Sequence, residues 1–192
     1  SSMHPSTMST EVIFGPKFTK IADELRLARV AIKHKDFEKA GSMLNGALKP
    51  FLKEELASDL AQALKIVINS IYGLTSAKFA NAFRDPNNID NLVAKRGALF
   101  MTLLKQEVEK KGYHVCHIKT DCIKINDADD YIHKFVVDFG KEYGYNFEVE
   151  HMFEKFVLIN DAVYVGKTTD GEWVTVGKQF QVPYVKKKLF TK

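Results

Sequence analysis

The chain has 192 residues, of which 45% are hydrophobic, 27% charged and 11% aromatic. This composition is typical of a soluble globular unit and excludes a disordered, collagen-like or fibrous protein. The longest uncharged apolar run falls far short of the roughly 18 residues that a membrane helix needs, and the first residues lack a signal-peptide pattern. Two cysteines give no secreted disulfide framework. We therefore expect an intracellular protein without a membrane partner.

The charge balance is mildly basic. Subtracting 24 acidic from 28 basic residues leaves +4, with a calculated pI near 8.9. Basic residues gather at 105–111 and 186–192, and acidic residues at 127–130. Such runs fit solvated helix faces and a chain end as well as a nucleic-acid surface, so charge alone does not establish a nucleic-acid partner.

The N-terminal third is predicted to be helical. Residues 1–16 lack periodicity, and we expect a flexible end whose first residues resemble a remnant of cloning. From Phe18 to Tyr72 apolar residues recur every three or four positions, which predicts two or three helices. Thr19 is the predicted cap of the first helix, and Gly73 the predicted stop of the last.

The middle of the chain predicts a helix, a hairpin and a second helix. The polar Asp-Pro-Asn-Asn turn at 85–88 precedes a long helix from about Ile89 to Lys111. Aromatic and β-branched residues then predict two short strands, Tyr113–Ile118 and Cys122–Ile125, joined by a tight turn. Helical spacing returns from Asp127 to Glu142, with Asn126 or Asp127 as the cap.

The C-terminal part alternates between polar and apolar residues, which predicts strands. These are expected at Phe147–His151, Phe156–Ile159, Ala162–Val165 and Trp173–Val176, with Asp170-Gly171 as a hairpin turn. The order of elements contains no strict βαβ alternation and no internal repeat. The predicted fold class is therefore α+β: a helical hairpin, then a helix, a β-hairpin, another helix and a small antiparallel sheet.

Polar residues line one side of the predicted helix that ends near Gly73. Lys65, Asn69 and Tyr72 follow the spacing i, i+4 and i+7, which places them within roughly 60° of each other. The opposite side is predicted to be buried, and consists of Leu60, Leu64, Val67, Ile68 and Ile71. A cation, an amide and a phenol on one surface suit a nucleotide. The spacing alone fits a solvated face equally well.

The segment from Lys65 to Gly73, K-I-V-I-N-S-I-Y-G, resembles the K-x-x-x-N-S-x-Y-G motif on the fingers helix of family B DNA polymerases. All five specified positions match. The resemblance implies that Lys65 contacts the phosphates of an incoming deoxynucleoside triphosphate and that Asn69 supports its triphosphate and sugar. Tyr72 and Gly73 would line the nascent base pair.

The resemblance extends to the first predicted helix. Arg29 and Lys33 are one turn apart there and would join Lys65 at the phosphates, as basic residues of the opposing fingers helix do in the family. Ordinary surface positions are the alternative interpretation for both.

The predicted hairpin resembles the family's Asp-Thr-Asp-Ser turn, whose second Asp binds two catalytic magnesium ions. Here it reads Lys119-Thr120-Asp121-Cys122. The resemblance therefore makes Asp121 the catalytic metal ligand and implies two Mg²⁺ ions in the whole enzyme, where hard oxygen ligands are needed. Lys119 would pair with Asp121 or contact DNA.

A zinc site is the competing interpretation of this region, because His114, Cys116, His117 and Cys122 lie within nine positions. Strand alternation places His117 opposite to His114 and Cys116, and the segment has no C-x-x-C pair. We therefore do not expect zinc here.

A further family element, K-x-Y, holds duplex DNA near the primer end. The matching segment is Ala162-Val163-Tyr164, which lacks the Lys. By this resemblance Tyr164 keeps an aromatic role at the DNA, and Lys167 supplies charge. The family's upstream D-x-x-S-L-Y-P motif, which provides a second metal carboxylate, is absent.

Together these features predict a fragment of a family B DNA polymerase. We expect a polymerase of phage type, because the fingers are compact and the hairpin sequence differs from the family's Asp-Thr-Asp-Ser. Residues 17–80 would form the fingers, 81–168 part of the palm, and 169–192 the end of the palm or the start of the thumb. An N-terminal polymerase and exonuclease portion would be missing. The implied partners are primer–template DNA and deoxynucleoside triphosphates, in the cytoplasm or, for a virus, in that of the infected host.

The implied reaction is template-directed transfer of a deoxynucleotide to a primer 3′ end. This chain alone is expected to be incomplete and inactive in that reaction. The alternative is a non-catalytic DNA-binding remnant or accessory module of polymerase shape, which the missing carboxylate motif favours. A domain that only binds other proteins is a third interpretation, and it predicts no salt-dependent DNA affinity.

Overall fold

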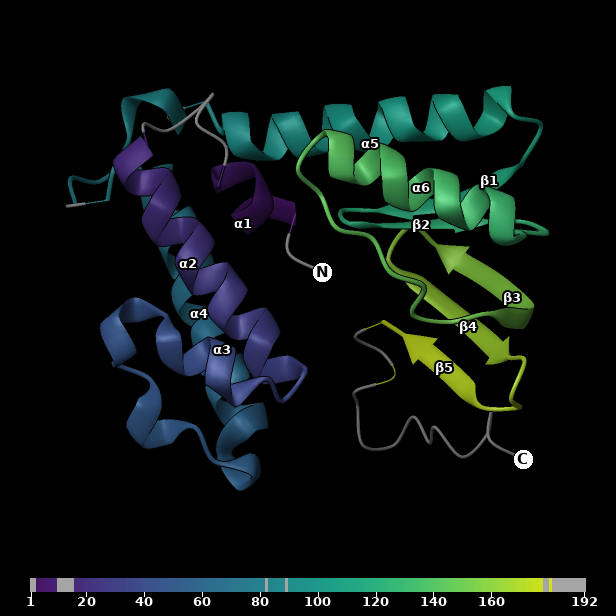
Figure 1. Ribbon diagram of the computed structural model, residues 1–192. Helices are drawn as coiled ribbons and strands as arrows, with labels where there is room; N and C mark the ends of the chain where they lie inside the picture. The colour runs from purple at the N-terminus through teal and green to yellow at the C-terminus, as the bar shows by residue number, and fades with distance from the viewer. Residues whose placement is uncertain (1–2, 10–15, 82, 89, 178–179, 181–192) are drawn as a thin grey trace. The chain divides into compact units, whose positions relative to one another are not determined.

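A computed structural model describes residues 3–9, 16–81, 83–88, 90–177 and 180 of the chain. The chain divides into two compact units, one formed by residues 1–102 and 142–145, the other by 103–141 and 146–192. Helices occur with two small antiparallel sheets (Figure 1), so the prediction of an α+β fold is confirmed. Among the described residues, none of the helices combines the length and the hydropathy of a membrane-spanning segment.

The first unit is helical. It contains α1 (Met3–Met8), α2 (Pro16–Lys33), α3 (Phe37–Ser42), α4 (Ala57–Thr75) and the first part of α5 (Leu92–Lys110). Short 3-10 turns connect α3 to α4 and precede α5, namely η1 (Leu44–Gly46), η2 (Lys49–Phe51), η3 (Glu54–Leu56) and η4 (Pro86–Asn88).

Helices α2 and α4 run side by side through a seam of small side chains (Figure 1). Ala28 and Ala31 on α2 and Ala57 and Ala61 on α4 are buried in one cluster, together with Ile32, Ala40, Leu48 and Leu64. Small residues let two helix backbones approach closely, and the larger aliphatic side chains complete the same buried cluster. This packing fixes which side of α4 is left for other contacts.

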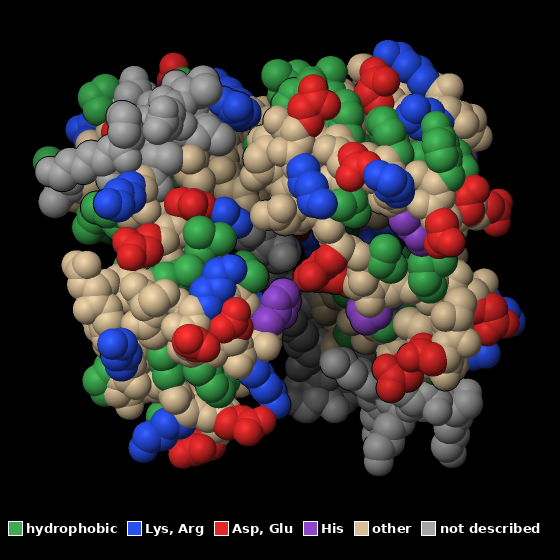
Figure 2. Space-filling view, in the orientation of Figure 1, with side chains coloured by type: hydrophobic (Ala, Val, Ile, Leu, Met, Phe, Trp, Pro, Cys, Tyr) green, Lys and Arg blue, Asp and Glu red, His purple; other side chains and the backbone are tan. Residues whose placement is uncertain are grey.

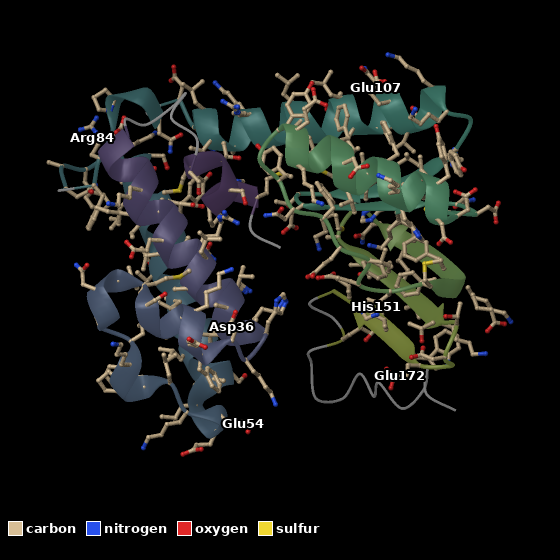
Figure 3. The ribbon with its side chains drawn as sticks, viewed as in Figure 1. Asp36, Glu54, Arg84, Glu107, His151 and Glu172 are labelled. Carbon is tan, nitrogen blue, oxygen red and sulfur yellow. The ribbon has the colours of Figure 1, made fainter. Side chains whose placement is uncertain are left out.

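Polar contacts shape the turn beyond α2 (Figure 3). The Asp36 carboxylate accepts a 3.1 Å hydrogen bond from the Lys39 amide and so caps α3. Glu54 lies 2.5 Å from the Lys35 ammonium, which lowers the pKa of the Glu54 carboxyl by hydrogen bonding and charge attraction. Both contacts are exposed, so they orient the loop more than they stabilise it.

The start of the chain differs from expectation. Met3–Met8 is helical and packed, with Thr7 and Met8 almost fully buried. The Thr7 hydroxyl lies 2.7 Å from the Tyr145 hydroxyl, and Met8 packs against Ala22 and Val93. This described part of 1–16 therefore belongs to the folded unit, which its composition did not indicate.

Two predicted helix ends in this unit were wrong. Helix α2 begins at Pro16, where the ring fixes φ and no amide hydrogen is needed, so Thr19 lies inside it. Helix α4 passes through Gly73 and ends at Thr75, whose hydroxyl donates a 2.6 Å hydrogen bond to the Tyr72 carbonyl.

One residue of the predicted buried face of this helix is exposed. The side chain of Val67 is 44% exposed, so the prediction that it is buried was wrong.

The second unit contains the sheets. Strands β1 (Val115–Lys119) and β2 (Cys122–Ile125) form an antiparallel hairpin, which confirms the predicted one. Helix α6 (Asp130–Glu142) follows, and then an antiparallel sheet of β3 (Phe153–Asn160), β4 (Val163–Thr168) and β5 (Trp173–Val176) in that order. Val163 and Val165 form a small core with Phe180 and Trp173.

Two predictions in this unit were also wrong. No strand forms at 147–151, since β3 pairs with β4 only from Phe153 opposite Thr168. Helix α6 is capped by Asp129, whose carboxylate accepts a 3.0 Å hydrogen bond from the Ile132 amide, and not by residue 126 or 127. Asp127 has a φ of 49°, in the left-handed region that an N-cap does not adopt.

Candidate functional site

The polar stripe of α4 flanks the buried seam instead of lying opposite to it. Lys65 and Asn69 are exposed, and Tyr72 is half-buried. Lys65 has no carboxylate within salt-bridge distance among the described residues. Its ammonium and the Asn69 amide are therefore available to a ligand on the same side of the helix as the Tyr72 ring.

Tyr72 is held on two sides. Its hydroxyl donates a 2.7 Å hydrogen bond to the side-chain oxygen of Asn91, and its ring stacks on that of His4 with centroids 4.5 Å apart at 22°. Burial raises the pKa of the Tyr72 phenol because it disfavours the phenolate. The side chain is therefore a neutral, oriented aromatic surface at physiological pH.

A buried hydrogen-bonded chain supports the same end of α4. The Asn88 amide donates a 2.6 Å hydrogen bond to the Thr75 hydroxyl, which donates to the Tyr72 carbonyl. The Asn88 oxygen accepts a 3.1 Å hydrogen bond from the Val93 amide in the first turn of α5. Since Thr75, Asn88 and Val93 are fully buried, the C-terminus of α4 is fixed to the start of α5.

Gly73 occupies a helical position that does not require glycine. A Cβ built there meets nothing within 4 Å, and its φ lies in the ordinary helical range. Glycine inside a helix costs about 1 kcal/mol relative to alanine, and here no packing contact offsets that cost. The space next to the Gly73 Cα is therefore open in the structure.

The basic residues of α2 have different environments. Arg29 is half-buried, and its Nε is buried without a hydrogen-bond partner in the described part of the chain. Lys33, the last residue of α2, is exposed. A buried unpaired guanidinium nitrogen is unfavourable. Basic side chains are otherwise interspersed with acidic ones on the face in Figure 2.

The hairpin of the second unit places Asp121 in its turn. Thr120 has a φ of 43°, and the Asp121 amide donates to the Lys119 carbonyl at 2.6 Å. The Asp121 side chain is half-buried. Lys119 forms no ion pair with it; instead its ammonium donates to the carbonyl of Ala162 at 3.3 Å.

The donor set around Asp121 does not fit two magnesium ions by itself. Among the described residues, no three His, Cys, Asp or Glu side chains converge as a metal site would require. One carboxylate supplies one ligand, so a complete site needs carboxylates that this part of the chain does not bring together.

Tyr164 and Lys167 are less available to DNA than the sequence indicated. Tyr164 is 9% exposed and packs against Phe153 and Phe156, with the Lys124 ammonium 4.4 Å from its ring centre. Lys167 pairs with Glu154 at 3.0 Å, which lowers the pKa of that carboxyl by hydrogen bonding and charge. The ring of Tyr164 is a packing surface, and the charge of Lys167 is partly neutralised.

No sequence motif indicated His4, Asn88, Asn91 and Lys124 as neighbours of the candidate residues. Asn91 had one local signal, because Asn tolerates the positive φ of 57° found there, just before α5. The other three residues depend on contacts between distant segments, which no periodic pattern indicates.

No protein-family model matches the chain, and no curated protein matches it. Among solved structures, it is similar to a family B DNA polymerase from the hyperthermophilic archaeon Pyrobaculum calidifontis. The TM-score is 0.59 at 15% sequence identity, over 96% of this chain and 28% of that one. The chain therefore folds like part of a family B DNA polymerase and spans 28% of the length of that neighbour.

Proposed function

We propose that the chain is the fingers and the later part of the palm of a family B DNA polymerase, which adds deoxynucleotides to a primer 3′ end as a template directs. Residues 17–80 would be the fingers, 81–168 the palm portion, and 169–192 the end of the palm or the start of the thumb. One observation carries the proposal: three residues of the α4 motif form one stripe, on which Lys65 and Asn69 are exposed and Tyr72 is oriented, in a chain that folds like part of such a polymerase.

In this proposal α4 binds the incoming nucleotide. The Lys65 ammonium attracts the triphosphate as a point charge, and the Asn69 amide hydrogen-bonds the sugar and phosphates. Arg29 and Lys33 add positive charge from α2.

The other end of the stripe faces the base pair. The Tyr72 ring, held by Asn91 and His4, limits where the base pair lies, and Gly73 leaves room for it. Fixing the reacting groups in this way is the main contribution that a polymerase scaffold makes to phosphoryl transfer.

Asp121 is proposed as one of the catalytic Mg²⁺ ligands, with the remaining carboxylates supplied by another part of the polymerase.

A phage-type origin remains part of the proposal, because the fingers helices are compact and the hairpin reads Lys-Thr-Asp-Cys. The second candidate function is a non-catalytic DNA-binding module of polymerase shape. It is favoured by the single carboxylate at the hairpin, since no metal-binding group of three converges in the described residues.

Nucleotide binding tests the proposal. The affinity of the chain for a deoxynucleoside triphosphate, with primer–template DNA present, is measured by calorimetry for the wild type and for Lys65→Ala. Losing a charge-assisted contact of about 1.5 to 3 kcal/mol weakens binding roughly 10- to 100-fold. The affinity for primer–template DNA is expected to change less than about twofold, because Lys65 contacts the nucleotide.

Lys53→Ala is the matched control, because Lys53 is also exposed in the first unit but lies outside the stripe. Its nucleotide affinity should equal that of the wild type. Equal losses of DNA and nucleotide affinity in Lys65→Ala would refute the role of Lys65. Salt-dependent DNA binding without any nucleotide binding would establish the non-catalytic module instead.

A further inference from the structure

Two lysines of the β1–β2 hairpin converge on the start of β4, within the second unit. The Lys119 ammonium lies 3.3 Å from the carbonyl oxygen of Ala162. The Lys124 ammonium lies 4.4 Å from the ring centre of Tyr164 and 5.8 Å from that of Phe156. Both positive charges therefore sit over one short segment, 162–164.

Neither charge is neutralised locally. In the described part of the chain, no carboxylate lies within salt-bridge distance of Lys119 or Lys124. Their contacts are a carbonyl, two aromatic rings and the Cys122 sulfur, which is 3.6 Å from the Lys124 ammonium. Lys167, farther along β4, is by contrast paired with Glu154. Two half-buried cations held by neutral groups form a site that favours an anion.

Two positions at which this chain differs from the polymerase motifs lie next to each other in the structure. Ala162 stands where the K-x-Y element has its lysine, and Lys119 stands where the hairpin motif has its first aspartate. The chain thus lacks a cation at 162 and has an additional one at 119. The Lys119 ammonium reaches the backbone of residue 162 itself, so the cation lies close to where the missing lysine would start.

The aromatic side chains at this site are buried, whereas the two lysine side chains lie over them. Tyr164 is 9% exposed and packed against Phe156, and His117 beside it is 6% exposed with its Nε2 3.1 Å from the Asp161 carbonyl. These rings form a fixed base. The lysine chains lie over it, and their ammonium groups make the polar contact.

We propose that Lys119 replaces, from the hairpin, the lysine that the K-x-Y segment lacks, and that Lys119 and Lys124 together bind backbone phosphates of the DNA next to Asp121. This inference rests on the proposed function and deepens it. Tyr164 is then a positioning residue that holds Lys124 through its ring, rather than a residue that contacts DNA.

Salt-dependent binding of primer–template DNA tests this assignment. Lys119→Gln and Lys124→Gln keep much of the side-chain stem and remove the charge. Each is expected to reduce the slope of log affinity against log salt by about 0.9 and the affinity at physiological salt by roughly fivefold. Lys119→Arg should retain the wild-type slope. Lys141→Gln, an exposed lysine of α6, is the matched control and should also bind like the wild type.

A charge relocation provides the decisive comparison. Lys119→Asp is expected to weaken DNA binding further than Lys119→Gln, and the added Ala162→Lys substitution should restore most of the affinity by returning the cation to β4. Circular dichroism of every variant verifies the fold. If Lys119→Gln and Lys124→Gln bind DNA as Lys141→Gln does, or if Ala162→Lys restores nothing, the assignment is wrong.

The nucleotide experiment separates this failure from that of the proposed function. Lys65→Ala can still lose nucleotide affinity selectively while Lys119→Gln has no effect, which overturns only the present inference. A wild-type chain without salt-dependent DNA affinity overturns both.

Discussion

Replacing Asn88 with alanine should destabilise the first unit more than most single substitutions. The side chain is fully buried and makes hydrogen bonds of 2.6 Å to the Thr75 hydroxyl and 3.1 Å from the Val93 amide. The substitution leaves the buried Val93 amide without a partner, which costs about 1 to 3 kcal/mol. Loss of the bond to Thr75 adds about 1 kcal/mol. We therefore expect a loss of about 3 kcal/mol in the free energy of unfolding.

Urea denaturation followed by far-ultraviolet circular dichroism measures this loss. The helical signal is the appropriate probe, because the single tryptophan, Trp173, lies in the other unit. With a typical slope of about 2 kcal/mol per molar urea, the midpoint falls by roughly 1.5 M. Asn146→Ala, at an exposed position, should leave it unchanged. An equal midpoint for Asn88→Ala and the wild type would mean that the hydrogen-bonded chain does not fix α4 to α5.

Three further outcomes are expected. Gly73→Ala should stabilise the first unit by up to about 1 kcal/mol in urea denaturation, because the Cβ meets nothing within 4 Å, yet weaken nucleotide binding in calorimetry; unchanged binding would remove Gly73 from the site. The Ile132 amide and the Tyr113 hydroxyl lower the pKa of Asp129, so its stabilisation is present above the unfolded carboxyl's pKa near 3.9 and is lost as the pH falls through the lower folded value. The stability gap between wild type and Asp129→Ala should accordingly shrink in acid titrations, and a gap independent of pH would contradict this cause. Finally, the chain alone should extend no primer in Mg²⁺; extension that Asp121→Asn abolishes would instead show that this chain contains a complete metal site.

Local patterns were sufficient to predict much of the fold. The periodic apolar residues before Gly73 predicted helices, and the β-branched residues around Asp121 predicted the hairpin that the structure contains. The α4 stripe also followed from helical spacing. The packed α1 could not be predicted, because Thr7 and Met8 are buried by contacts with distant residues and not by a pattern of their own.

The supports of the site depend on such distant contacts. Asn88 and Thr75 are 13 positions apart, Tyr72 and Asn91 are 19 apart, and Lys119 and Ala162 are 43 apart. No spacing rule within one helix or strand relates these pairs, since each depends on how separate elements pack. The spacing within one helix can therefore indicate candidate ligand-binding residues, whereas the residues that hold them in place cannot be found in this way.

Two glycines have opposite surroundings: packing requires glycine at one position and not at the other. At Gly166 on β4, a Cβ would lie 2.5 Å from the Phe153 ring, so glycine is needed for the sheet to pack. At Gly73 a Cβ would meet nothing, although alanine would make the helix more stable. Glycine at position 73 lowers helix stability without a packing reason, so Gly73→Ala isolates the proposed site. A loss of nucleotide binding in a helix that alanine makes more stable would come from the added Cβ and not from a loss of structure.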